Sequence, residues 1–252
     1  MIVEKIYAQN SLRNFNYILS CPKTRKAIVI DPLATEEIRN HIRKSELELQ
    51  FIINTHEHHD HIAGNKDLTK YTTAKIIGFH GLRDKVPGLT DVFKDKDNIV
   101  IGEEKIKVLH TPGHTQNHSC LYYEKQPALF CGDTLFYAGV GNCKHGGNVQ
   151  NLFETIETLR KEIPDNTMIY PGHDYLEKNL EFAKKHNPHS NAVKKFEISG
   201  LNTTSYFHDF LTEKTINPFL QLRSKALRET LKLNTALDSE VFFKLRAMRD
   251  QF

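Results

Sequence analysis

The hydrophobic positions of the first 170 or so residues fall mostly in short runs with the spacing of β-strands. These runs are rich in β-branched and aromatic residues, and polar turns separate them. Residues 35–44 differ, because Ile38 and Ile42 lie four positions apart behind acidic residues, which predicts a helix. A second helix is expected over about 151–161. The expected strands are residues 2–7, 15–21, 26–30, 49–54, 74–79, 98–101, 105–110, 119–124, 128–133 and 167–170.

The periodicity changes from about 2 to about 3.6 residues near position 173. Residues 176–186, 217–233 and 239–252 carry apolar side chains at helical spacing, whereas residues 199–219 predict an irregular loop across the surface. The sequence therefore predicts two domains. One covers residues 1–172 and alternates strands with helices, and the other covers residues 173–252 and is helical.

The composition is that of an ordinary globular protein. The chain has 252 residues, of which 39% are apolar and 26% charged, enough for one catalytic unit with one substantial core. It contains no run of about 18 apolar residues, and its first residues lack the apolar stretch of a secretory signal. Four cysteines without a CxxC pair suit a reducing compartment. We therefore expect a cytoplasmic protein that does not bind membranes.

The charge is small but unevenly distributed. A formal net charge of +3 does not favour nucleic-acid binding, for which clustered basic residues are expected. From residue 175 onward, however, 13 Lys and Arg face 9 Asp and Glu. A solvated helical face explains such an excess, and so does a nearby site for a modestly anionic substrate.

The most informative segment is THEHHDH at residues 55–61, directly after the expected strand 49–54. His56 and His58 point to one side, because alternate residues of an extended chain share a face, and Asp60 and His61 follow at the next turn. Imidazole and carboxylate groups are ligands of zinc and its first-row neighbours. Two residues of the segment are expected to point away: Glu57 and His59.

Three more candidate ligands each follow an expected strand, and each is preceded by glycine. His114 lies in TPGHT, Asp133 in CGDTLF and His173 in PGHDY. A glycine lets the backbone turn sharply and bring the next side chain to the edge of the sheet. The series therefore predicts one site built from several loops.

In their order and spacing, THEHHDH, TPGHT, GDTLF and PGHDY resemble glyoxalase II, the hydroxyacylglutathione hydrolases of the metallo-β-lactamase superfamily. The resemblance runs nearly end to end and includes the terminal segment LRAMRDQF. It implies an α/β (α+β) fold: a four-layer αββα sandwich as the catalytic domain, followed by a helical domain that covers the substrate. It also implies hydrolysis of S-D-lactoylglutathione to D-lactate and glutathione.

The same resemblance implies a role for each candidate ligand. Two divalent metal ions would share one hydroxide, the nucleophile that attacks the thioester, and Asp133 would bridge the two ions. Asp60 and Asp133 would be the carboxylates nearest this hydroxide. The remaining ligands would divide between a first ion (His56, His58, His114) and a second ion (Asp60, His61, His173).

Further residues are candidates for supporting the ligands or binding glutathione. Asp31, at the end of the strand in VIDP, is expected to hold a ligand histidine, with Thr55 and Thr115 as weaker candidates. Family resemblance points to three substrate contacts, Tyr175, Arg246 and Arg249. The chain departs from the family at Asn142, where Lys or Arg is typical. Three alternatives stay open: Lys144 or His145 substitutes for the missing charge, glutathione binds more weakly, or the carrier thiol differs.

Three alternatives stay open within the superfamily: a β-lactamase, a lactonase, and a persulfide dioxygenase with one iron. The retained Asp60, His61 and His173 favour two ions over one, and the helical tail favours the glutathione thioesterase. Zinc is the first expectation for the metal, with iron or manganese as alternatives. We expect a small-molecule glutathione thioester as the partner and a monomeric protein.

Overall fold

Two β-sheets form the centre of the molecule, which is described by a computed structural model for residues 1–196 and 202–252. The first sheet has the order β1-β2-β3-β4-β5-β6, antiparallel from β1 to β3 and parallel from β3 to β6. Its strands are β1 Ile2–Tyr7, β2 Phe15–Ser20, β3 Lys26–Ile30, β4 Glu48–Asn54, β5 Lys75–Phe79 and β6 Leu89–Phe93.

The second sheet has the order β13-β10-β9-β8-β7, in which β10 and β13 are parallel and the other pairs antiparallel. A small hairpin, β11 with β12, follows β10. The strands are β7 Asn98–Ile101, β8 Glu104–His110, β9 Ser119–Tyr123, β10 Ala128–Gly132, β11 Leu135–Phe136, β12 Gly139–Val140 and β13 Met168–Pro171.

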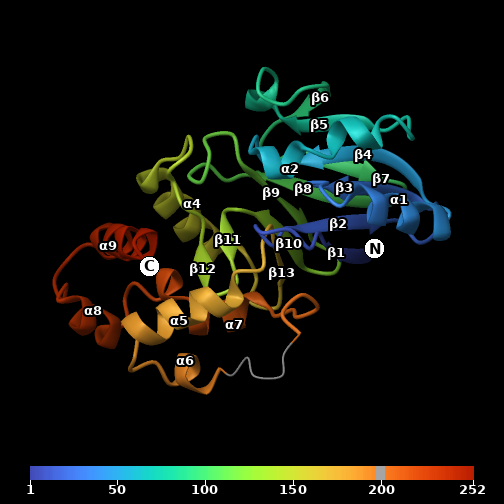
Figure 1. Ribbon diagram of the computed structural model, residues 1–252. Helices are drawn as coiled ribbons and strands as arrows, with labels where there is room; N and C mark the ends of the chain where they lie inside the picture. Colours follow the sequence, from blue (N-terminus) through green and yellow to red (C-terminus); the bar gives the residue numbers. More distant parts are fainter. Residues whose placement is uncertain (197–201) are drawn as a thin grey trace.

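The helices cover the outer faces of the two sheets (Figure 1). Those that follow β13 gather beside α4, away from the N-terminus. In the described residues the helices are α1 Thr35–Lys44, α2 His59–Ile62, α3 Asn65–Leu68, α4 Val149–Glu162, α5 Leu176–His186, α6 Asn191–Lys195, α7 Phe210–Ile216, α8 Lys225–Leu231 and α9 Asp238–Asp250, with 3-10 turns η1 His80–Leu82 and η2 Pro218–Leu220.

Apolar side chains form two cores, one on each face of the second sheet. Phe15, Ile28 and Ile52 of the first sheet pack with Ile106 and Leu121 of the second to form the core between the sheets. The opposite face of the second sheet packs under α4 and the C-terminal helices, which is why every residue of β9 and β10 is buried. This layering confirms the expected αββα sandwich with a C-terminal helical domain.

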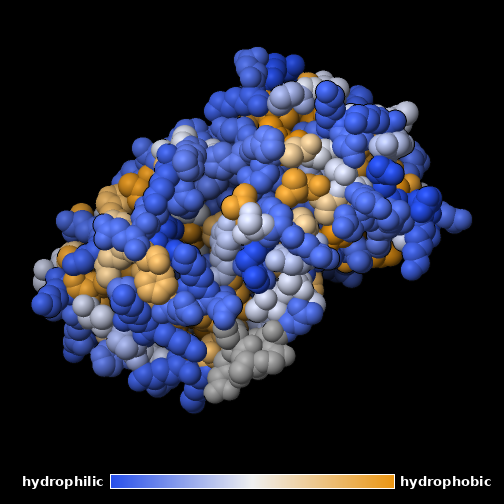
Figure 2. Space-filling view, viewed as in Figure 1, coloured by the Kyte–Doolittle hydropathy of each residue, from blue (hydrophilic) through white to orange (hydrophobic). Residues whose placement is uncertain are grey.

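The surface on one face of the molecule is mostly hydrophilic, and its hydrophobic residues lie in small separate areas (Figure 2). Within the described residues, no helix is long and apolar enough to cross a membrane.

The expectation of an irregular loop over 199–219 was wrong for its second half. Residues 199–201 lie outside the described residues, but α7 and η2 occupy much of the remainder. Asp209 caps α7 by accepting a hydrogen bond from Thr212 N at 2.9 Å, and Phe210 and Ile216 are buried. A seven-residue helix is too short to show clear periodicity, so tertiary burial stabilises it rather than local sequence. The sequence did not predict strand β6. Only Phe93 of its five residues is buried, so the strand has no clear hydrophobic pattern.

Gly113, just before a candidate ligand, lets α4 approach the end of β8. Its φ is +147°, and a Cβ at this position would lie 2.4 Å from Leu152 Cα and 2.6 Å from Leu152 N. Both atoms belong to the backbone of α4, so they cannot move aside without displacing the helix.

We expect Gly113→Ala to lower the free energy of unfolding by about 2–4 kcal/mol, from backbone strain and overpacking together. The matched control is Gly146→Ala, where φ is +86° but no atom lies within 4 Å of the added Cβ. It should lose only the backbone part, about 1–2 kcal/mol. Urea denaturation measures both, and equal losses would show that contact with α4 is unimportant.

Candidate metal centre

The first ligand group, His56, His58 and His114, joins the end of β4 to the loop after β8. β4 ends at Asn54 and α2 begins at His59, so His56 and His58 lie in the short connection between these two elements. His56 Nε2 lies 3.1 Å from His58 Nδ1, and His114 Nε2 lies 3.0 Å from the same Nδ1. Three ring nitrogens therefore converge on one point.

The second ligand group, Asp60, His61 and His173, joins the first turn of α2 to the loop after β13. His61 Nε2 and His173 Nε2 are 3.1 Å apart, and Asp60 Oδ2 lies 3.3 Å from His61 Nε2 and 3.4 Å from His173 Nε2. Gly172 makes this approach possible, because a Cβ there would lie 2.4 Å from Asp133 Oδ1. These three ligand atoms also lie within reach of a single ion.

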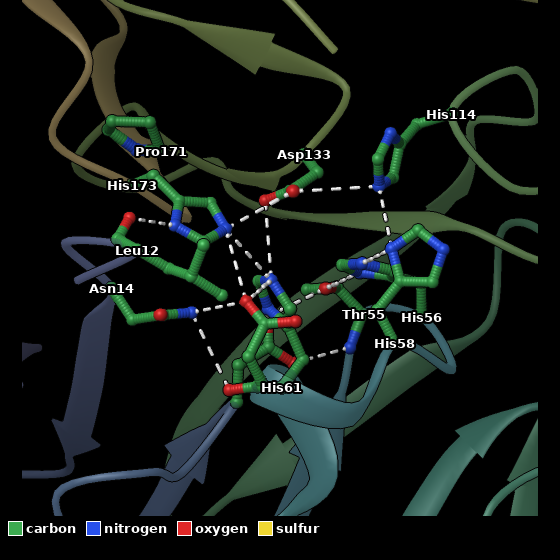
Figure 3. A network of polar contacts seen from close by, with 12 residues as sticks. Leu12, Asn14, Thr55, His56, His58, His61, His114, Asp133, Pro171 and His173 are labelled. Carbon is green, nitrogen blue, oxygen red and sulfur yellow. Dashed lines mark hydrogen bonds and ion pairs between the residues drawn. The ribbon is translucent and has the colours of Figure 1, made fainter. Parts of the chain in front are cut away.

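Asp133, at the end of β10, lies between the two groups (Figure 3). Its Oδ2 is 3.5 Å from His114 Nε2 and 3.2 Å from His173 Nε2, and its Oδ1 is 3.5 Å from His61 Nε2. Oδ1 is buried without a hydrogen-bond partner among the described residues. A buried carboxylate oxygen that lacks a partner is the position at which a cation is expected.

The other ring nitrogen of every ligand histidine already has a partner. If each imidazole carries its proton on that side, the nitrogens that face one another present lone pairs rather than N–H groups. The donor set therefore fits two divalent ions held by imidazole and carboxylate groups. The partners are Thr55 Oγ1 for His56 at 3.0 Å, His145 O for His58 at 3.0 Å, Asp31 Oδ2 for His61 at 2.9 Å, Asn142 O for His114 at 2.7 Å and Leu12 O for His173 at 2.7 Å.

The carboxylates of the site are ionised. Burial, the largest influence on Asp133, raises its pKa, but His173 and His61 outweigh burial and hold the pKa well below its usual range. Burial also opposes ionisation of Asp60, yet His61 and a hydrogen bond from Asn14 lower its pKa. Both residues therefore offer negative charge to a cation.

The histidines respond to burial and charge in opposite ways. Burial lowers the pKa of His56 well below its usual value and lowers that of His114, so both rings are neutral and can act as ligands. At His61 burial also acts to lower the pKa, but Asp133 and Asp31 raise it well above the usual value. The surroundings of His61 thus favour positive charge, which a bound ion would supply.

Asp31 occupies the supporting position that the sequence suggested. The residue has a φ of +48°, and it accepts hydrogen bonds from Thr55 N at 2.8 Å and Thr55 Oγ1 at 2.6 Å in addition to its contact with His61. A left-handed backbone is costly for aspartate, so the surrounding contacts must stabilise it. Glu57 points away, as expected, toward Lys85 and Thr115.

Two supporting residues were not foreseen. Asn14 Nδ2 donates to Asp60 Oδ2 at 2.8 Å, and it lies in a polar N-terminal loop that carries no recognisable signal. His118 is fully buried, and its Nε2 accepts a hydrogen bond from Asp133 N at 3.1 Å. The spacing of His118 four residues after His114 was the one available clue, and a single histidine is weak evidence.

The predicted substrate residues line a cavity of about 350 Å³ beside the second ligand group. Tyr175 stacks on His173, with ring centroids 4.9 Å apart and planes 3° from parallel. Arg249 donates to Asn179 Oδ1 from Nε and Nη2, and Lys144 Nζ donates to Asp250 O at 3.2 Å. The same cavity is also lined by Asn142, Lys178 and Arg246.

Comparison with known proteins agrees with this geometry. A family model of the metallo-β-lactamase superfamily matches residues 16–173. The chain has a TM-score of 0.69 to the B3 metallo-β-lactamase BLEG-1, with 19% identity over 87% of this chain and 100% of that one. ETHE1 from Myxococcus xanthus gives a TM-score of 0.68, with 23% identity over 99% and 98%. These structures establish the fold, and the chain belongs to the metallo-β-lactamase superfamily.

Sequence relatives narrow the assignment. A model of the hydroxyacylglutathione hydrolase C-terminus matches residues 174–252. The hydroxyacylglutathione hydrolase of Polaromonas sp. is 40% identical and that of Nitrosococcus oceani 38%, and in both comparisons all of each chain is covered. Within the superfamily, this chain is a member of the hydroxyacylglutathione hydrolases, which confirms the family expected from the motifs.

We expect Asp133→Asn to lower the metal content from about two ions per chain to one or fewer, because the amide cannot supply negative charge between both groups. Elemental analysis after dialysis against metal-free buffer gives the count. Glu57→Gln is the matched control, since this carboxylate lies among the ligands of THEHHDH but contacts Lys85 and Thr115. Two retained ions in Asp133→Asn would contradict the bridging role.

Proposed function

We propose that this chain hydrolyses S-D-lactoylglutathione, and related 2-hydroxyacylglutathione thioesters, to the hydroxy acid and glutathione. The observation that carries the proposal is the direct contact between Tyr175, in the substrate cavity, and His173, in the second ligand group. The full-length similarity to hydroxyacylglutathione hydrolases supports the same activity. The reaction is the second step of methylglyoxal detoxification.

The proposed ligands are those of the two groups together with Asp133, and we propose zinc as the metal. When bound, two such ions would activate water and polarise the thioester carbonyl. Asp60 and Asp133 hold negative charge at the centre, and the five imidazoles fix where the ions would sit. The leaving thiolate needs little help from a general acid, so the site does not require a dedicated proton donor.

Tyr175 and the cations of the cavity would bind the glutathione part. Burial raises the pKa of Tyr175, so its hydroxyl stays protonated and can donate a hydrogen bond. Arg249 and Lys144 already have partners in Asn179 and Asp250, so substrate must share or displace those contacts.

Lys178 is a further cation for this role. It is exposed, lies on α5 three residues after Tyr175 and lines the same cavity. Asn142 also lines the cavity, at the position where the family resemblance implies a basic residue, and brings no charge. We propose that Lys178 supplies the missing charge to a substrate carboxylate.

Several properties remain predictions. The division of the chain at residue 173 is supported by the two family models, which meet between residues 173 and 174. The monomeric state and the cytoplasmic location remain predictions from the sequence.

A substrate panel tests the activity. Purified protein loaded with Zn²⁺ should hydrolyse S-D-lactoylglutathione with a kcat/KM at least a hundredfold above that for a β-lactam or an acyl-homoserine lactone. Release of free thiol, measured continuously, gives the rate. No preference for the thioester would reject the proposal, as would one iron per chain together with oxygen consumption on glutathione persulfide.

Lys178→Ala should raise KM for the glutathione thioester about fivefold, with kcat changed less than twofold, because an exposed ion pair contributes about 1 kcal/mol. The effect should shrink at high salt. Lys184→Ala is the control, an exposed lysine on the same helix that does not line the cavity. If both variants behave alike, Lys178 has no specific role.

A further inference from the structure

We propose that Arg246 is a positioning residue through which α9 holds the first ligand group in place for its ion. The connection runs through residues 141–147, between β12 and α4, which we term the 141–147 loop. The inference rests on the proposed function only in that two ions bind the two ligand groups. It assigns Arg246 to ligand support rather than to direct contact with substrate.

The 141–147 loop orients two of the three histidines in the first ligand group. His114 Nδ1 lies 2.7 Å from Asn142 O, and His58 Nε2 lies 3.0 Å from His145 O. Each carbonyl accepts the N–H of its histidine and thereby turns the other ring nitrogen inward, where His114 Nε2 and His58 Nδ1 are 3.0 Å apart. The position of the loop therefore sets the direction of both lone pairs.

Arg246 holds the start of this loop. Its Nη1 donates to Val140 O at 2.8 Å and to Gly141 O at 3.1 Å, and its Nη2 donates to Asp250 Oδ1 at 2.9 Å. The residue is only 6% exposed, and its Nε is buried without a partner among the described residues. The guanidinium thus faces backbone carbonyls and a carboxylate of α9, not the open part of the cavity.

The contact between loop and ligands is too close to absorb a displacement. A Cβ at Gly141 would lie 2.0 Å from Asp133 O and 3.1 Å from His114 Nδ1. At its other end the loop leads to Asn148, whose N donates to Gly113 O at 2.8 Å, just before His114. Lys144 Nζ also donates to Asp250 O. Movement of α9 must therefore move the carbonyls that orient the first ligand group.

The second ligand group has different supports. Leu12 O accepts from His173, Asn14 donates to Asp60, and Asp31 contacts His61. These supports lie in the N-terminal loop and after β3, and none belongs to α9 or the 141–147 loop. Loss of the Arg246 contacts should therefore affect one ion and spare the other.

The test is Arg246→Met, which keeps the unbranched side chain but removes its donors, in two backgrounds of the full chain. In His173→Ala the remaining complete group is the first, and in His114→Ala it is the second. Zn²⁺ affinity is measured by competition with a chromophoric chelator. We expect Arg246→Met to weaken Zn²⁺ binding about 10–100-fold in the His173→Ala background and less than twofold in the His114→Ala background.

Lys244→Met is the matched control. Lys244 lies on the same helix and donates to Leu231 O at 2.9 Å, outside the 141–147 loop, so its loss should change neither affinity. Asp250→Asn, which removes the negative charge from the side-chain partner of Arg246, provides a second variant in case Arg246→Met does not fold. It should show a smaller loss in the same background only.

Equal losses in the two backgrounds would overturn the inference, because they would indicate general destabilisation. An unchanged Zn²⁺ affinity in the His173→Ala background would also overturn it. Thioester hydrolysis by the unaltered chain is measured separately. The proposed activity can therefore fail while the positioning role stands, and the reverse also holds.

Discussion

The carboxylate of Asp133 is buried among histidine nitrogens, and the arrangement around it depends on providing positive charge at that point. Burying a charge without compensation is costly. Either the neighbouring imidazoles must be protonated, or bound cations must supply the positive charge. The partners of the ligand histidines decide between these outcomes. Because Asn142 O and Leu12 O each accept a hydrogen bond from one ring nitrogen, the other nitrogens of His114 and His173 face inward and are available to ions.

The ligands come from the ends of several strands and from loops of both sheets, so the site forms only when the sandwich is complete. β4 leads to the first motif, β8 to His114, β10 to Asp133 and β13 to His173. Backbone supports for these ligands come from still other segments. This distribution explains why the candidate ligands depend on the core between the sheets although none of them belongs to it.

The C-terminal helices have two roles in this arrangement. They complete the cavity in which Tyr175, Lys178 and Arg249 would meet a glutathione thioester, and through Arg246 they contact the loop that orients the first ligand group. The B3 metallo-β-lactamase BLEG-1 and ETHE1 from Myxococcus xanthus share this fold. The helical segment that packs on the second sheet is the part of the chain that matches the hydroxyacylglutathione hydrolase C-terminus.

The candidate ligands and most strands and helices could be predicted from the sequence, and the resemblance of its motifs to a known family implied the sandwich. THEHHDH and the three glycine-preceded ligands are local patterns, since strand periodicity and turn glycines act over a few residues. The hydrogen-bond partners that orient these histidines could be found only from the tertiary structure. They are the backbone carbonyls of Leu12, Asn142 and His145, which no side-chain pattern marks and which lie far from their histidines in the sequence. The contact of Arg246 with the backbone of Val140 and the formation of α7 were also not predictable from the sequence, because both depend on burial against segments distant in sequence.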